Sequence, residues 1–131
     1  MSKLITAISN AANAPTPIGA YSQVTIANGL AFCAGQIAID PATGKLIDGD
    51  VVAQTKQVLS NLDYVLKAAN SSWHHVTMTS VFLPDLTNSK IVNELYSGYV
   101  NLEAPPARQT LGVKELPLGA LVEISVIAVT K

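Results

Sequence analysis

The single arginine of the chain, Arg108, is the side chain best suited to chemistry on a small anion. It follows Pro106 and Ala107 where a strand is expected to start. A turn fixed by proline aims a long side chain, and a planar guanidinium binds both oxygens of a carboxylate, which lysine does not do. Arg108 is therefore a candidate carboxylate ligand, and a surface arginine without function is the alternative from the residue alone.

Glu123 is the second candidate, because it is an acidic residue inside an otherwise apolar segment. Its structural alternatives are an ion pair or a charge that protects an edge strand from aggregation. Two further features contain Tyr21, in the segment 18–23, and Gly35, at a point where a strand meets a turn. Each of these is a weak signal by itself.

The cysteine and the two histidines do not form a catalytic or metal-binding pattern. Cys33 lies in the apolar run 30–34 and is expected to be a buried hydrophobic side chain rather than a nucleophile. His74 and His75 are adjacent, so they point in different directions, and no further ligand stands at metal-binding spacing around them. The sequence also lacks glycine-rich nucleotide loops and a nucleophile elbow. We expect no metal and no cofactor.

Composition narrows the class of protein. The chain has 131 residues, of which 49% are hydrophobic and only 13% charged, with a net charge of −1. Nucleic-acid binders need clustered Lys and Arg, so nucleic acid is not expected as the main partner. No apolar run approaches the roughly 18 residues of a membrane span, and the first residues are too polar for a secretory leader. We expect a soluble protein of the cytoplasm, or alternatively of the mitochondrion, that hides apolar surface against copies of itself.

These candidates must be positioned by a single domain, residues 1–131, because no linker or repeat divides the chain. Asn28-Gly29 predicts a hairpin between strands at 24–27 and 30–34, and another turn is expected at 40–44. Apolar residues at three-and-four spacing predict a helix over 51–69. Asp48 or Asp50 would cap its start, and Asn70 would end it in a left-handed conformation.

The second half of the chain predicts a strand at 76–83, a helix at 88–100 and strands at 109–114 and 121–130 around a turn at 117–119. The order β-β-α-β-α-β-β is typical of an α+β fold with two helices on one face of a mixed sheet. The last strand is apolar on both faces, so the sheet face without helices needs a cover. Partner subunits would supply it.

The features above, taken together and in order, resemble the RidA family, also called YjgF/YER057c/UK114. The match runs from about residue 15 to residue 129. The motifs that carry it are Ile18-Gly-x-Tyr-Ser-Gln23, Gly35-Gln-Ile37, Asp40-Pro-x-Thr-Gly44, Gln54-Thr55 with Asn61-Leu62, Val81-Phe-Leu83 with Asp85, Asn93-x-x-Tyr96, Pro106-Ala-Arg108, and Leu116-Pro117 with Val122-Glu-Ile124.

The resemblance implies a chorismate-mutase-like fold and a homotrimer with three clefts between subunits. It also implies hydrolysis of reactive enamines and imines, 2-aminoacrylate and 2-aminocrotonate with their imine tautomers, to 2-oxo acids and ammonia, without metal or cofactor. By the same resemblance the catalytic residues are Arg108, which holds the substrate carboxylate, Glu123, which positions water, and Tyr21, which lines the cleft. Gly35, Asn93 and Thr110 join Arg108 and Tyr21 in binding substrate.

The chain departs from the family pattern at four positions. Ala34 stands where many members have Ser, Thr110 where several deaminases have Cys, Ala20 where Pro is usual, and Ser89 where an aromatic residue is common. These changes bear on rate and substrate range.

Two alternatives remain open. One is a non-enzymatic trimer that binds small carboxylates or acts as a chaperone or translation inhibitor. The other, chorismate mutase chemistry, is weakly supported, because it needs several cationic groups and the chain offers one arginine.

Overall fold

The computed structural model describes residues 4–131; the first three residues of the expected domain lie outside this part. The long helix α1 spans Val51–Ala68 and confirms the prediction from periodicity. Asp50, one of the two expected caps, accepts a hydrogen bond from the backbone N–H of Ala53. The left-handed Asn70, with φ of 58°, follows its C-terminus as predicted.

The hairpin expected at Asn28-Gly29 is present. Strand β2 spans Val24–Ala27 and β3 spans Leu30–Gln36, two residues longer than predicted. Asn28 and Gly29 have φ of 50° and 74°, the pair of positive values that a type I′ turn requires. The predicted turn at 40–44 connects β4 (Ile39–Asp40) to β5 (Lys45–Leu46), and these two short strands form a second hairpin that was not predicted.

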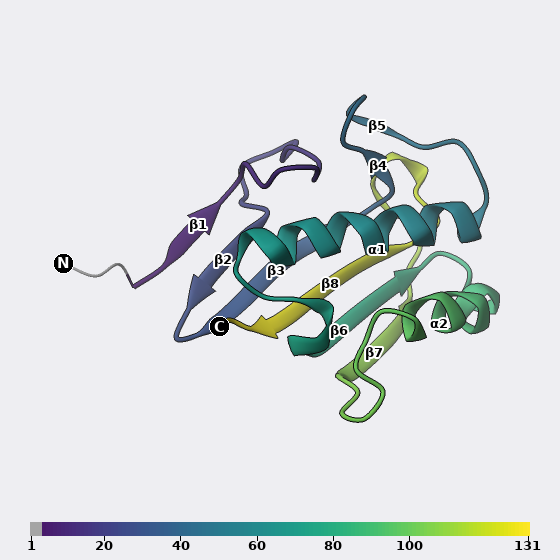
Figure 1. Ribbon diagram of the computed structural model, residues 1–131. Coiled ribbons are helices and arrows are strands. Elements are labelled where there is room, and N and C mark those ends of the chain that lie inside the picture. Colours follow the sequence, from purple (N-terminus) through teal and green to yellow (C-terminus); the bar gives the residue numbers. More distant parts are fainter. Residues whose placement is uncertain (1–3) are drawn as a thin grey trace.

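The main sheet has six strands in the order β1-β2-β3-β8-β6-β7 (Figure 1). Strand β1 (Thr6–Ile8) was not predicted, whereas β6 (Val76–Leu83) has the predicted bounds. Neighbouring strands are antiparallel except β6 and β7 (Ala107–Gly112), which are parallel. The sheet is therefore mixed, with β8 (Glu123–Val129) at its centre.

The predicted bounds of three elements in the second half were wrong. The helix α2 spans Ser89–Ser97 and ends before Gly98, because glycine is a poor helix former; a short 3-10 turn precedes it. Strand β7 begins at Ala107 rather than at 109, directly after the proline, and ends at Gly112. Strand β8 begins two residues later than predicted, because a 3-10 turn with left-handed Leu118 and Gly119 leads into it.

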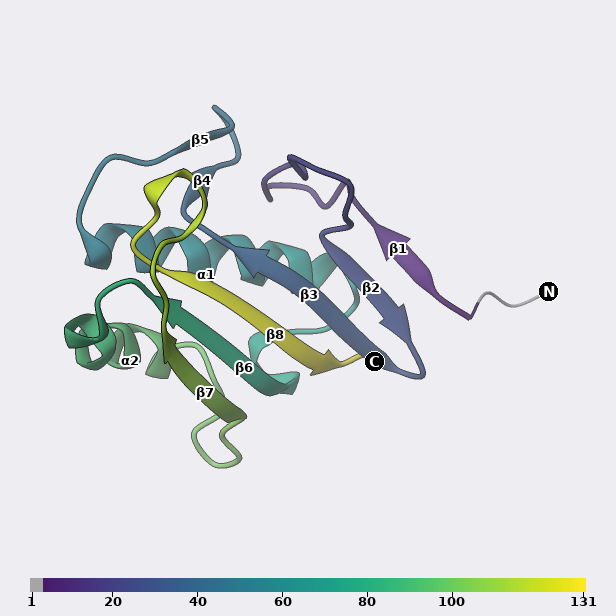
Figure 2. The same ribbon diagram turned by 180° about the vertical axis from the view of Figure 1, so that it is seen from behind.

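Both helices cover the same face of the sheet, as predicted; Figure 2 shows the other face without helices. Alternate residues along β8, together with the residue that precedes it, explain this layering. Val122, Ile124, Val126 and Ala128 are buried toward the helices, while Ile127 and Val129 on the opposite face are half-buried or exposed. The sheet thus has one packed face and one open face, and β8 presents apolar side chains on the open face as well.

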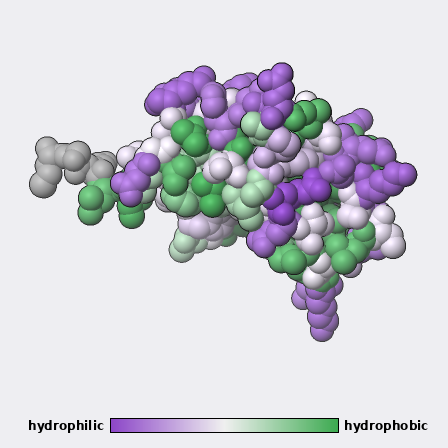
Figure 3. All heavy atoms as spheres, turned by 90° about the horizontal axis from the view of Figure 1, so that it is seen from below, coloured by the Kyte–Doolittle hydropathy of each residue, from purple (hydrophilic) through white to green (hydrophobic). Residues whose placement is uncertain are grey.

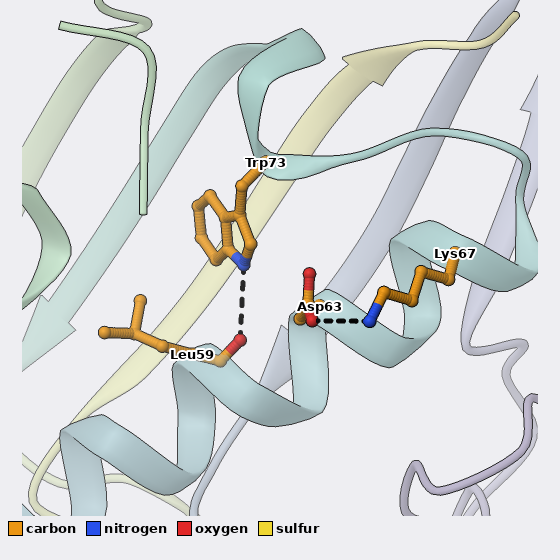
Figure 4. Close-up of polar contacts among 4 residues, drawn as sticks. All are labelled: Leu59, Asp63, Lys67 and Trp73. Carbon is orange, nitrogen blue, oxygen red and sulfur yellow. Dashed lines mark hydrogen bonds and ion pairs between the residues drawn. The ribbon is translucent and has the colours of Figure 1, made fainter. Parts of the chain in front are cut away.

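Trp73, in the segment after α1, forms a hydrogen bond with that helix. Its indole N–H donates to the carbonyl oxygen of Leu59 at 3.2 Å, as Figure 4 shows. The same view shows the i, i+4 ion pair between Asp63 and Lys67 on the outer side of α1, with 3.1 Å between Oδ2 and Nζ. Its solvent exposure makes this pair a minor contributor to stability.

Apolar side chains also reach the surface. On the face shown in Figure 3 they form separate groups among polar residues rather than one continuous belt. The exposed large hydrophobic residues are Leu4, Ile5, Ile18, Tyr21, Phe32, Leu86, Leu102, Leu111, Leu118 and Val129. Within residues 4–131, no helix has the length and hydrophobicity to cross a membrane.

Candidate functional site

Arg108 is the second residue of strand β7, and its side chain contacts helix α2. Its Nη1 donates to the Oδ1 of Asn93 on α2, 2.5 Å away, and its guanidinium carbon lies 5.3 Å from the centre of the Tyr96 ring. The Tyr96 hydroxyl in turn donates to the buried Oγ1 of Thr79 on β6, at 2.9 Å. Arg108 is thus held by an amide, by a cation–π contact and indirectly by a buried hydrogen bond.

These residues border a cavity of about 400 Å³ between α2 and strands β6 and β7, which we call the arginine cavity. Thr110, two residues after Arg108, also lines it. The full lining is Val81, Leu86, Ser89, Lys90, Val92, Asn93, Tyr96, Arg108 and Thr110. Basic and neutral side chains make up this lining, so the cavity favours an anion.

Glu123 begins the central strand β8, which rules out a role as an edge-strand protector. The structural ion pair is also absent, since Asp63–Lys67 is the one ion pair found within residues 4–131. Burial raises the pKa of the Glu123 carboxyl. A carboxyl group with a raised pKa and no charged partner holds its proton to a higher pH than an exposed glutamate, which suits it to take up and return a proton.

Gly35 provides the space that the Glu123 side chain occupies. The pairing of β3 with β8 shifts between Cys33 and Gln36, and this bulge brings the glycine against the carboxylate. A Cβ at position 35 would lie 2.8 Å from the Glu123 Oε2 and 2.9 Å from its Cδ. Any larger residue would displace the carboxylate.

Tyr21 is held by the loop before β2. Its hydroxyl accepts a hydrogen bond from the Ile18 backbone N–H at 3.2 Å, and its side chain is 47% exposed. The loop is anchored by the buried Gln23, whose Oε1 accepts from the Ala11 N–H at 2.8 Å and whose Nε2 donates to the Pro15 carbonyl at 2.7 Å. The ring is thereby fixed at the surface, where a ligand can reach it.

Tyr21, Gly35 and Glu123 line a second cavity of about 310 Å³, which we call the glutamate cavity. Its remaining lining residues are Pro15, Thr16, Ile18, Gln23, Ala34, Gln36, Ile37, Ile39 and Pro117. None of these side chains is basic. The arginine cavity has cations without an acid, and the glutamate cavity has an acid without a cation.

The six candidate residues therefore form two groups of three. Arg108 contacts α2, on the face covered by helices. Glu123 alternates with Val122 and Ile124, which are buried toward the helices, so its side chain points to the open face. One chain by itself does not bring Arg108 and Glu123 onto the same small molecule.

Sequence reasoning did not assign a site role to two buried polar residues of α1. The Nδ2 of Asn61 donates to the carbonyl oxygens of Ile37 and Ile39, at 3.3 and 2.9 Å, and both of these residues line the glutamate cavity. The Oε1 of Gln54 accepts from the Leu121 N–H at 2.9 Å, two residues before Glu123. The sequence signal for both was a polar residue on the face of the helix that is otherwise apolar, since a buried polar side chain needs a hydrogen-bond partner.

The remaining reactive residues lie outside both cavities. Cys33 is buried, as predicted, and burial raises the pKa of its thiol to about 12, so it is a poor nucleophile. His74 and His75 are exposed, and the latter contacts the Ser72 hydroxyl through Nδ1. Across residues 4–131 no three His, Cys, Asp or Glu side chains gather as a metal-binding group.

The chain is similar in sequence to known proteins over most of its length. A family model described as Endoribonuclease L-PSP matches residues 11–130. A RutC family protein of Synechocystis is 45% identical over 119 residues, which is 90% of this chain and 92% of the relative. A rat protein named 2-iminobutanoate/2-iminopropanoate deaminase is 40% identical over 129 residues, 98% of this chain and 93% of the relative.

Solved structures show the same architecture. A crystal structure of a Yersinia pestis protein, described as being of unknown function in the conserved Rid protein family, superposes with a TM-score of 0.91 at 42% identity. The superposition covers 96% of this chain and 99% of the other. Fold and sequence therefore agree over nearly the whole chain.

Proposed function

The chain belongs to the RidA family, and on that premise we propose that it hydrolyses reactive 2-enamino and 2-imino acids to 2-oxo acids and ammonia. The substrate class comprises 2-aminoacrylate and 2-aminocrotonate with their imine tautomers, 2-iminopropanoate and 2-iminobutanoate. The observation that carries the proposal is the position of the only arginine, oriented by Asn93 and Tyr96 at a cavity without acidic residues.

Arg108 would bind the carboxylate that every 2-imino acid carries beside its reactive carbon. Because the guanidinium is already oriented by Asn93, binding a carboxylate costs little side-chain ordering. The same contact excludes imines that lack this anion. Asn93 and Thr110 would complete the binding surface from α2 and β7.

Glu123 would direct a water molecule onto the imine carbon. The water oxygen bonds to that carbon and one water proton passes to the carboxylate. As the C=N π pair moves to nitrogen, the carboxylate returns this proton there, which gives a tetrahedral carbon bearing a hydroxyl and an amino group. The remaining hydroxyl proton then passes through the carboxylate to nitrogen, the C–N bond breaks as ammonia leaves, and the carbon keeps the oxygen as a ketone. Tyr21 and the backbone at Gly35 would line the cleft around the reacting group.

Arg108 and Glu123 can act on one substrate only if they come from two copies of the chain that are in contact. The arginine cavity of one copy facing the glutamate cavity of another would unite an anion ligand with an acid–base group. A cyclic homotrimer supplies three such clefts, and its contacts would also cover the open face of the sheet. The trimer and its clefts are part of the proposal.

Three of the four departures from the family pattern line these cavities. Ala34 lies in the glutamate cavity, and Thr110 and Ser89 lie in the arginine cavity, while Ala20 belongs to the loop that carries Tyr21. They alter the surroundings of the substrate and leave Arg108 and Glu123 in place. We therefore expect hydrolysis to be retained, with an altered rate and substrate range.

The test generates 2-aminoacrylate with a serine dehydratase and follows pyruvate with lactate dehydrogenase. The wild-type protein should accelerate pyruvate formation, and Arg108→Ala should remain folded, because the side chain is exposed, but lose at least about 100-fold in activity. Full activity in a folded Arg108→Ala protein would refute the role of the arginine.

A mixing experiment tests the shared cleft. Arg108→Ala and Glu123→Gln should each be inactive alone. When equal amounts are refolded together, about a quarter of the clefts should regain activity, because they combine Arg108 from a Glu123→Gln copy with Glu123 from an Arg108→Ala copy. Absence of recovery in mixtures that sediment as trimers would contradict a site formed by two subunits.

The alternative is a non-enzymatic trimer that binds small carboxylates or acts as a chaperone or translation inhibitor. It predicts no acceleration of pyruvate formation by the wild-type protein. A chaperone or translation effect would moreover be equal in the wild type and in Arg108→Ala, since neither role needs that guanidinium.

A further inference from the structure

The arginine cavity contains a second cation that imine hydrolysis as proposed above does not use. Lys90 lies in the first turn of α2, is exposed, and lines the cavity together with Arg108. Monocarboxylate substrates such as 2-iminopropanoate present one anionic group, and Arg108 is assigned to it. The ammonium group of Lys90 is then left without a function.

The placement of Lys90 follows from the helix that carries it. Ser89, Val92, Asn93 and Tyr96 recur at the spacing of one helical face, and that face forms a wall of the cavity. Lys90 borders this face, one turn before Asn93, which holds the guanidinium of Arg108. The two cations thus lie on the same cavity, one on the helix wall and one on the strand wall.

Neither cation has an acidic partner within the part of the chain that the structure describes. No carboxylate lines the cavity, and the one ion pair found joins Asp63 and Lys67 on another helix. Glu94, one turn after Lys90, does not pair with it, and Asp85 accepts hydrogen bonds from the backbone N–H and hydroxyl of Thr87. The positive charge of the cavity is therefore available to a ligand.

The polar surroundings also suit an additional anionic group. The hydroxyls of Ser89 and Thr110 line the cavity and form no hydrogen bond with another side chain of residues 4–131. Hydroxyls donate to carboxylate oxygens, and two separate cations match a ligand with two separate carboxylates. A volume of about 400 Å³ exceeds the needs of a three- or four-carbon acid.

We propose that the arginine cavity selects 2-imino dicarboxylates, with the carboxylate next to the imine on Arg108 and the distal carboxylate on Lys90 with Ser89. The class comprises 2-iminosuccinate and 2-iminoglutarate, the imines of aspartate and glutamate. This inference rests on the proposed hydrolysis and specifies its substrate. An oxidase acting on acidic amino acids is the class of reaction that supplies such imines.

The first experiment compares kcat/KM for 2-iminosuccinate, made in place by an aspartate oxidase, with that for 2-iminopropanoate, made by a serine dehydratase. Lys90→Gln should lower the ratio of the dicarboxylate to the monocarboxylate value by about tenfold, the effect of losing one charge-assisted hydrogen bond. Lys56→Gln, which removes an exposed lysine of α1 outside both cavities, should leave the ratio unchanged.

A binding experiment decides the same question without turnover. Calorimetric titration of the full-length protein should show tighter binding of 2-oxoglutarate than of 2-oxobutanoate, and Lys90→Gln should remove the difference. AMP serves as a phosphate-bearing probe. Tighter binding of AMP than of 2-oxoglutarate would overturn the dicarboxylate assignment in favour of a phosphate ligand.

The outcomes separate the two proposals. If 2-iminopropanoate is not hydrolysed by the wild type, the proposed function fails, and the oxo acid titrations still decide whether the cavity binds dicarboxylates. If 2-iminopropanoate is hydrolysed but the ratio is the same in wild type and Lys90→Gln, the proposed function stands and the dicarboxylate site is refuted.

Discussion

Gly35→Ala is expected to abolish most of the activity while leaving the protein folded. The new Cβ would lie 2.8 Å from the Glu123 Oε2, where ordinary contacts begin at 3.4 Å. The three nearest atoms all belong to the Glu123 side chain, which can rotate, and not to the backbone. The substitution therefore displaces the carboxylate by about 0.6 Å or turns it into another rotamer.

The expected cost in stability is small. Moving the side chain off its preferred rotamer costs about 0.5–1.5 kcal/mol. Replacing glycine by alanine where φ is not positive returns about 0.4–1 kcal/mol by restricting the unfolded chain. The free energy of unfolding should change by less than about 1 kcal/mol. Activity should fall by about 100-fold, because a misplaced catalytic group loses its alignment with the substrate.

The assay pairs imine hydrolysis with urea unfolding of the same preparation. Gly98→Ala is the matched control, since a Cβ there meets only the Leu95 carbonyl oxygen at 3.4 Å and the position lies outside both cavities. In a Glu123→Gln background, Gly35→Ala should cause little further loss. Wild-type activity in Gly35→Ala, or a loss matched by unfolding, would refute the view that this glycine acts through Glu123.

Further predictions follow from the burial of three groups, Glu123, Asn61 and Cys33. Burial raises the pKa of Glu123, so the folded wild type loses stability as pH rises above the usual glutamate pKa and this carboxyl ionises. Glu123→Gln lacks this ionisation, so its free energy of unfolding, measured by urea titration, should increase relative to wild type as pH rises toward neutral. A difference that stays constant from about pH 4 to 8 would contradict this. Hydrolysis by wild type should decline as pH falls through the raised pKa. Asn61→Ala should lower the free energy of unfolding by about 2–3 kcal/mol, because two buried carbonyls lose their donor. Asn101→Ala should change it by less than about 1 kcal/mol, because this half-buried side chain makes only an exposed hydrogen bond with the Glu103 N–H. Cys33 should resist thiol reagents at pH 8 until the protein unfolds, because burial holds its pKa near 12; rapid labelling of the native protein would show the strand to be accessible.

The sequence predicted correctly those turns and helix ends that depend on only a few neighbouring residues. The Asn28-Gly29 turn, the Asp50 cap and the left-handed Asn70 each depend on a few neighbouring residues, and all three are present. The short strand β1 was not predicted, because three residues carry little pattern and are held as a strand only by pairing with β2. The early end of α2 reflects the chain leaving the helix at Gly98, although apolar spacing continued to residue 100.

The sequence by itself determined which residue types were available for chemistry: one arginine, one acid within an apolar strand, and a tyrosine and a glycine in recognisable motifs. It also determined the two-helix, mixed-sheet class, because periodicity is a local property. Only the tertiary structure decided that Arg108 and Glu123 point to opposite faces of the sheet. Side-chain direction depends on strand register and on the bulge at Gly35, and both are fixed by pairing between strands distant in the chain.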